Sequence, residues 1–201
     1  MPQSNPRVVL IRHGATEWSV SGQHTGRTDI PLTDAGRAAA ERLGARLAGE
    51  RFALVLSSPL ARAAETCRLA VPGADRAELT DDLMEWDYGA YEGRRTADIR
   101  EERAGWLLWT DGVPDGETID EVAARVDRVI ARARDVDGDV ALCAHGHVLR
   151  VLAARWLDEP PTFGGRLKLD TAALSILAWD RELPALTLWN DTSHLANPAA
   201  R

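Results

Sequence analysis

Short apolar runs alternate with amphipathic segments along the chain. Val8 to Ile11, Phe52 to Leu56 and Val140 to Ala144 are apolar without polar alternation, which is typical of buried parallel strands. Thr33 to Gly49 and Val122 to Ala133 carry apolar residues at helical spacing. Because strand and helix patterns alternate, we predict a mostly parallel sheet with helices on both of its faces.

Polar residues indicate where further elements begin and end. Thr33 precedes the first helical segment and is a suitable N-cap, and Thr118 to Glu121 has capping-box spacing ahead of the second. Val148 to Leu157 predicts another helix. Ala172 to Trp189, interrupted by a charged Asp180 to Glu182, predicts two late strands that form an antiparallel edge pair.

These elements predict an α/β fold, a three-layer α/β/α sandwich around one mostly parallel sheet. The chain has 201 residues, 45% of them hydrophobic, which is enough to bury one core. No repeat or linker interrupts the pattern, so we expect a single domain over residues 1–201. We expect the tail from Ser193 to Arg201 to be frayed, with His194 in solvent.

Three polar clusters follow predicted strands, at residues 12–14, 57–62 and 145–147. Ligands of open α/β sheets bind outside the carboxyl ends of the strands, so we expect these clusters to converge. A neutral imidazole such as His13 can attack phosphorus, and guanidinium groups match phosphoryl oxygens. We expect Gly14 to let a phosphate approach the backbone. The pattern favours a phosphoryl-binding site.

Composition narrows the class of ligand. The net charge of −7 disfavours nucleic acid as the main partner. Lys168 is the only lysine, and its context, Arg-Leu-Lys-Leu, fits neither a Walker-type phosphate loop nor a pyridoxal site. Cys67 and Cys143 are the only cysteines and lack CxxC spacing, so no disulfide framework is predicted. We expect a small anionic partner in a local cationic pocket.

A metal site at His145 and His147, two residues apart, is the alternative to a phosphate site. No further set of residues at ligand spacing supports it, and clustered arginines repel a divalent cation, so we predict no metal and no organic cofactor. No apolar run approaches the roughly 18 to 20 residues of a membrane span, and Met1 to Pro6 lacks a signal-peptide layout. We expect a cytoplasmic protein without membrane association, with a homo-oligomer as an open alternative.

The polar clusters belong to five motifs in a fixed order. These are Leu-Ile-Arg-His-Gly-Ala-Thr-Glu-Trp at 10–18, His-Thr-Gly-Arg-Thr-Asp-Ile-Pro-Leu-Thr at 24–33, Ser-Ser-Pro-Leu-Ala-Arg-Ala-Ala-Glu-Thr at 57–66, Glu-Trp-Asp-Tyr-Gly-Ala-Tyr-Glu-Gly at 85–93 and Ala-His-Gly-His at 144–147. Together they resemble the histidine phosphatase superfamily, in its phosphoglycerate-mutase-like branch. Within that family the chain is most similar to small actinobacterial acid phosphatases and to fungal sedoheptulose-1,7-bisphosphatase.

The resemblance implies a role for each site residue. His13 would be the nucleophile, with Arg12, Arg62 and His145 completing the phosphate pocket. Glu85 would protonate the leaving alcohol and then activate water against the phosphohistidine. Such a proton donor typically accelerates the reaction by about 10² to 10⁴-fold. The implied function is the hydrolysis of small phosphate monoesters, with sugar phosphates as candidate substrates. The implied enzyme is of the histidine acid phosphatase type.

The environment of these groups can also be anticipated. Trp86 and Tyr88 are expected to desolvate Glu85 and to raise its pKa, and nearby arginines are expected to keep His13 neutral. His147 is expected to be structural. We expect the loops 18–27 and 94–117 to set specificity. The residues expected to touch the substrate are His24, Thr25, Gly26, Tyr88 and Arg150.

The sequence leaves two alternatives open. The protein is either a cofactor-dependent phosphoglycerate mutase or a catalytically silent phospholigand-binding protein in these alternatives. In the family pattern the mutases carry a basic residue near the position of Thr96, whereas this chain has a threonine there, with Arg94 and Arg95 close by as alternatives. Loss of catalysis normally removes the nucleophile or the acid, and both His13 and Glu85 are present. A phosphatase is therefore favoured.

Overall fold

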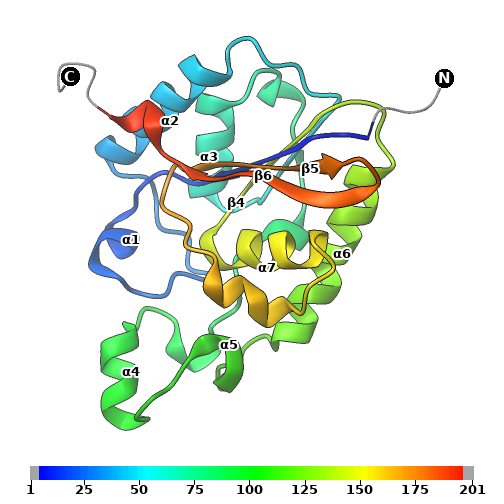
Figure 1. Ribbon diagram of the computed structural model, residues 1–201. Helices are drawn as coiled ribbons and strands as arrows, with labels where there is room; N and C mark the ends of the chain where they lie inside the picture. The colour runs from blue at the N-terminus through cyan, green and yellow to red at the C-terminus, as the bar shows by residue number, and fades with distance from the viewer. Residues whose placement is uncertain (1–4, 197–201) are drawn as a thin grey trace.

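A six-stranded sheet forms the centre of the computed structural model, which describes residues 5–196 (Figure 1). The strand order is β3-β2-β4-β1-β5-β6. Strands β1 to β4 are parallel, β5 runs antiparallel to β1, and β6 antiparallel to β5. The mostly parallel sheet with an antiparallel edge pair is confirmed. The strands are β1 (Val8–Arg12), β2 (Leu54–Ser57), β3 (Glu78–Leu79), β4 (Val140–Ala144), β5 (Leu174–Asp180) and β6 (Leu183–Asp191).

Helices cover both faces of the sheet, as Figure 1 shows. One face packs against α2 (Asp34–Leu47) and α3 (Ala61–Ala70), the other against α6 (Ile119–Arg134) and α7 (Gly146–Trp156). Alternate residues of β1 belong to separate cores: Val8 and Leu10 join the α6 and α7 core, Val9 and Ile11 the other. The predicted three-layer α/β/α architecture is confirmed.

The predicted helix starts are also confirmed at two positions. The Thr33 hydroxyl accepts a hydrogen bond from the Gly36 N–H (3.0 Å), and the Thr118 capping box forms ahead of α6. By contrast, α7 begins at Gly146, before the predicted start at Val148. Its first turn thus lies at the predicted site.

Shorter helices complete the fold, and Figure 1 shows α4 and α5 projecting away from the sheet. The expectation of a frayed tail is wrong for its first residues, which form a short helix. There the half-buried His194 donates from Nε2 to the Ala172 carbonyl (3.0 Å), so His194 is not a solvated side chain. Residues 197–201 lie outside the described range. The short helices are α1 (Glu17–Ser21), η1 (Ala74–Arg76), η2 (Asp81–Leu83), η3 (Gly89–Tyr91), α4 (Thr96–Glu102), α5 (Leu108–Asp111), η4 (Pro161–Arg166) and η5 (Ser193–Leu195).

Within residues 5–196, no helix combines the length and the apolar character needed to cross a membrane.

Candidate active site

The carboxyl ends of β1, β4 and β2 bring the three predicted clusters together. Because β4 lies between β1 and β2, His13, Ser58 and His145 follow three adjacent strands. The ring centroids of His13 and His145 are 5.2 Å apart, and Ser58 Oγ lies 2.8 Å from His145 Nε2. The clusters therefore converge as the strand pattern predicted.

His13 is fixed by its backbone and by one ring nitrogen. Its N–H donates to the Ala144 carbonyl (3.0 Å), and its own carbonyl accepts from the Ala172 N–H (2.9 Å). Nδ1 lies 2.7 Å from the Gly14 carbonyl oxygen. A carbonyl only accepts hydrogen bonds, so Nδ1 carries the hydrogen and Nε2 keeps a free lone pair in the neutral ring.

The pKa of His13 determines whether that lone pair is available. Burial, followed by the charges of Arg12 and Arg62, lowers the pKa of His13 to about 3. The ring is therefore neutral at pH 7. The ring was expected to be neutral because of the arginines, but burial is the largest single cause of the lowered pKa.

Arg12 supplies an unused donor next to His13. Its NH1 donates to the Leu169 carbonyl, which orients the guanidinium. Its Nε is buried and has no hydrogen-bond partner within residues 5–196. A buried donor without an acceptor is unfavourable, so an anionic oxygen in the pocket would satisfy it.

Arg62 and His145 lie behind the pocket rather than on its lining. Arg62 Nε donates to His145 Nδ1 (3.1 Å), so His145 carries its hydrogen on Nε2 and donates to Ser58 Oγ. The other guanidinium nitrogens of Arg62 donate to backbone carbonyls. Nη1 donates to the carbonyl of Thr28, and Nη2 donates to those of Thr25 and Gly26. Direct phosphate contact by Arg62 and His145 stays a prediction.

The Glu85 carboxylate sits on the first turn of α7. It accepts backbone hydrogen bonds from the N–H groups of His147 (3.0 Å) and Val148 (2.9 Å), and from that of Trp86 (3.0 Å). Burial raises the pKa of this carboxyl, but hydrogen bonding to His147 lowers it. The resulting pKa is well below the ordinary value. The expectation of a raised pKa is therefore wrong for the free site.

A polar pocket of about 190 Å³ opens in front of His13. Most residues predicted for the site line it, whereas Gly26, Arg62 and His145 do not. Gly26 is a packing residue, since a side chain there would meet the Trp86 carbonyl oxygen at 2.6 Å. The lining residues are Arg12, His13, Ser19, Gly22, Gln23, His24, Thr25, Glu85, Tyr88, Gly146, His147, Arg150 and Leu169.

Imidazole and aromatic side chains, those of His24, Tyr88 and His147, form one wall of the pocket. Tyr88 Oη is hydrogen-bonded to His147 Nδ1 (2.6 Å), and the rings of His24 and Tyr88 are tilted with centroids 4.8 Å apart. His147, expected to be structural, therefore lines the pocket. The Arg150 guanidinium lies over the Trp109 ring, 4.6 Å from its centroid, and holds that wall in place.

Several lining residues were not predicted from the sequence to touch the substrate. Ser19 and Gln23 lie in the segment 18–27, which was expected to matter only as a whole and to be a loop, whereas its first part belongs to helix α1. His147 had a detectable signal, its position on the helix that follows His145. Leu169 has no motif that marks it, because it contributes through its backbone carbonyl.

Gly14 has a different role from the expected one. A side chain at Gly14 would come within 2.4 Å of the Gly36 carbonyl oxygen at the start of α2. The missing side chain therefore allows β1 and α2 to pack closely, rather than making room for a phosphate.

Replacing Gly14 by alanine should lower the free energy of unfolding by about 1 to 3 kcal/mol, because a rigid backbone atom must move. Urea unfolding at pH 7 measures the change. Gly49→Ala is the matched control, since a side chain there meets nothing within 4 Å. Unchanged stability of the Gly14 variant would contradict the close packing.

Among residues 5–196, no group of three or more His, Cys, Asp or Glu side chains is arranged to hold a metal ion.

Comparison with known proteins identifies the family. The model of the histidine phosphatase superfamily (branch 1) matches residues 8–192. An acid phosphatase of Mycobacterium tuberculosis is 40% identical, covering 94% of this chain and 95% of its own length. Sedoheptulose 1,7-bisphosphatase of Saccharomyces cerevisiae is 37% identical, covering 78% and 69%. The solved structure of a Mycobacterium tuberculosis open reading frame has a TM-score of 0.86 at 38% identity, covering 92% and 97%. Both expected kinds of relative are thus found, and the chain belongs to branch 1 of the histidine phosphatase superfamily.

Proposed function

We propose that the protein is a phosphatase that hydrolyses small phosphate monoesters through a phosphohistidine on Nε2 of His13. One observation carries the mechanism: a buried, neutral imidazole with its free lone pair on Nε2 shares a pocket with Arg12 and Glu85. Phosphatase activity is supported by the family and by the phosphatase names of two relatives. No metal or organic cofactor takes part in the proposed steps.

In the first step, Nε2 of His13 attacks phosphorus while the bond between phosphorus and the leaving oxygen breaks. Arg12 offers its unused Nε–H to a phosphoryl oxygen. The negative charge of the bound phosphoryl group raises the pKa of Glu85, because like charges disfavour the carboxylate. A protonated Glu85 then gives its hydrogen to the leaving oxygen, which departs as an alcohol.

In the second step, water attacks the phosphohistidine. Glu85, now a carboxylate, takes one hydrogen from the water, while the bond between phosphorus and Nε2 breaks. Inorganic phosphate is released, and His13 returns to its neutral form. The lowered pKa of His13 keeps the nucleophile neutral in mildly acidic solution too, which supports the histidine acid phosphatase type.

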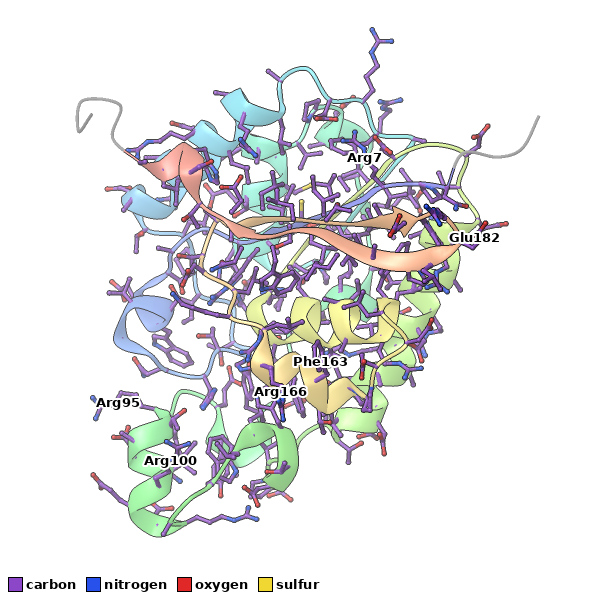
Figure 2. All side chains as sticks on the ribbon, in the orientation of Figure 1. Arg7, Arg95, Arg100, Phe163, Arg166 and Glu182 are labelled. Atoms are coloured by element: carbon purple, nitrogen blue, oxygen red, sulfur yellow. The ribbon has the colours of Figure 1, made fainter. Side chains whose placement is uncertain are left out.

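The positions of the basic side chains near Thr96 favour hydrolysis over mutase activity. Arg94 pairs with Glu102 and Arg95 with Asp98, and neither arginine lines the pocket. Figure 2 shows Arg95 beside α4, in the part that projects from the sheet. The Thr96 hydroxyl is 3.3 Å from Nε2 of His24. The pocket therefore lacks the extra basic residue that the mutase alternative requires.

A phosphate-release panel tests this proposal. It compares sugar bisphosphates, phosphoglycerates and p-nitrophenyl phosphate, beside a mutase assay with and without 2,3-bisphosphoglycerate. We expect phosphate release to exceed transfer for every compound, since water is the second acceptor. A mutase rate that dominates the panel would overturn the proposal, as would the absence of any phosphate release.

A further inference from the structure

An ion pair between a buried arginine and a half-buried glutamate lies next to the segment that carries Glu85. Arg125, on α6, is only 5% exposed. Its Nε and NH2 donate to the two carboxylate oxygens of Glu117, at 2.9 and 3.1 Å. This two-point arrangement fixes both planes, because a guanidinium and a carboxylate match in geometry. Neither residue lines the pocket.

Arg125 also holds the chain on the amino-terminal side of Glu85. Its NH1 donates to the Asp82 carbonyl (2.9 Å) and to the Met84 carbonyl (2.6 Å). The Met84 carbonyl belongs to the peptide group directly before Glu85. Arg125 thus restrains the peptide from which the Glu85 side chain projects.

Glu117 holds the chain on the carboxyl-terminal side of Glu85. Its Oε2 accepts from the Asp87 N–H (2.9 Å), and its backbone carbonyl accepts from Trp86 Nε1 (2.8 Å). A backbone hydrogen bond from the Glu117 N–H to the Asp87 carbonyl (3.0 Å) completes the contact. The ion pair therefore binds the chain on both sides of Glu85.

The segment needs such side-chain support because it has no regular structure. Helix η2 ends at Leu83 and η3 begins at Gly89, so no helix or strand fixes the backbone at Glu85. The Glu85 carboxylate must nevertheless stay at 2.9 to 3.0 Å from the N–H groups of α7 and face the pocket. A displacement of about 1 Å at a reacting group can cost on the order of 10²-fold in rate.

We propose that the Glu117–Arg125 pair is a positioning device for Glu85, which acts only through the placement of that carboxyl. This inference rests on the proposed proton transfer by Glu85. It predicts a selective defect: variants of the pair should lose most activity where the leaving group needs a proton. They should lose less where the leaving group departs unprotonated, because Glu85 then acts only in the hydrolysis of the phosphohistidine.

The tests are Arg125→Lys and Glu117→Gln, assayed with glycerol 2-phosphate and p-nitrophenyl phosphate. Lysine keeps the charge but cannot make four oriented hydrogen bonds, and glutamine keeps the shape without the charge. We expect kcat for glycerol 2-phosphate to fall by about 10- to 100-fold, and kcat for p-nitrophenyl phosphate to fall by less than about threefold. Thermal unfolding checks that each variant is folded at the assay temperature. If one of the two variants is unfolded there, the activity of the other variant decides the test.

Arg128→Ala is the matched control. Arg128 lies on the same helix and pairs with Asp82 of the same segment, but its side chain is 63% exposed. An exposed ion pair contributes little to structure, so this variant should retain wild-type rates on both substrates. An equal selective loss in Arg128→Ala would overturn the assignment to the Glu117–Arg125 pair.

The double variant Glu85→Gln/Arg125→Lys separates positioning from general stability. If Arg125 acts only through Glu85, adding Arg125→Lys to Glu85→Gln should change kcat for glycerol 2-phosphate by less than about twofold, because interacting sites are not additive. Additive losses, equal losses on both substrates, or no loss would overturn the inference. A Glu85→Gln variant without any substrate selectivity would instead overturn the proposed role of Glu85, and this inference with it.

Discussion

Replacing His13 by alanine should lower kcat for every phosphate monoester by at least about 10⁴-fold, because the variant lacks the proposed phosphoryl acceptor. His145 is the nearest second imidazole, but both of its ring nitrogens are already hydrogen-bonded, to Arg62 and to Ser58. It cannot replace His13 without breaking that arrangement. Phosphate release under saturating p-nitrophenyl phosphate measures the loss.

The same experiment should locate the intermediate. An alkaline quench of the wild-type enzyme during turnover should preserve a phosphohistidine, and mass spectrometry should assign it to His13. His194→Gln is the control, since His194 contacts the Ala172 carbonyl and does not line the pocket. Near-normal turnover by His13→Ala, or a phosphoryl group on another residue, would contradict the mechanism.

Much of the fold could be predicted because the signals that define it are local. The apolar run of β1 lacks alternation, and the structure buries both of its faces in separate cores. The same reasoning located β4 and α6. It missed β3, since both residues of Glu78–Leu79 are exposed and carry no apolar pattern. This strand exists only through its pairing with β2.

The residues of the site could be predicted more reliably than their states. The position of a residue directly after a strand can be recognised in the sequence, and His13 and Arg12, which were expected at the site on that ground, line the pocket. Whether a donor of a side chain is free to bind a ligand depends on backbone carbonyl groups that lie far away in the sequence. Arg62 was expected to face phosphate, but three of its hydrogen bonds end on the carbonyls of the loop 25–28, which no motif discloses.

The pKa of Glu85 shows the same limit. Its aromatic neighbours suggested desolvation and a raised pKa, which would keep the proton in place. The structure instead puts the carboxylate on the N–H groups of a helix that begins 61 positions later in the chain, at Gly146. Only the three-dimensional fold reveals those donors. In the proposed mechanism, Glu85 therefore gains its proton together with the substrate.

This makes the charge at position 85 testable with a nearly isosteric change. Glu85→Gln cannot donate a proton to an alkoxide. Its amide also cannot accept at both oxygen positions, so an NH₂ group would face either the His147 N–H or the Trp86 and Val148 N–H groups. Some stability should be lost, and thermal unfolding must be measured beside activity. Glu92→Gln is the matched control, since Glu92 also accepts backbone N–H groups, those of Gly26 and Thr28, outside the pocket.

Glu85→Gln should lower kcat for glycerol 2-phosphate by about 10² to 10⁴-fold, because its alkoxide must be protonated as it leaves. The loss on p-nitrophenyl phosphate should stay below about tenfold, since nitrophenolate departs without a proton. Formation of the phosphohistidine from p-nitrophenyl phosphate should therefore be little changed, and the remaining loss should fall on its hydrolysis, where Glu85 takes a hydrogen from water. A burst of nitrophenolate followed by slow turnover would show that division directly. Equal losses on both substrates, shared by Glu92→Gln, would assign Glu85 to the fold rather than to proton transfer.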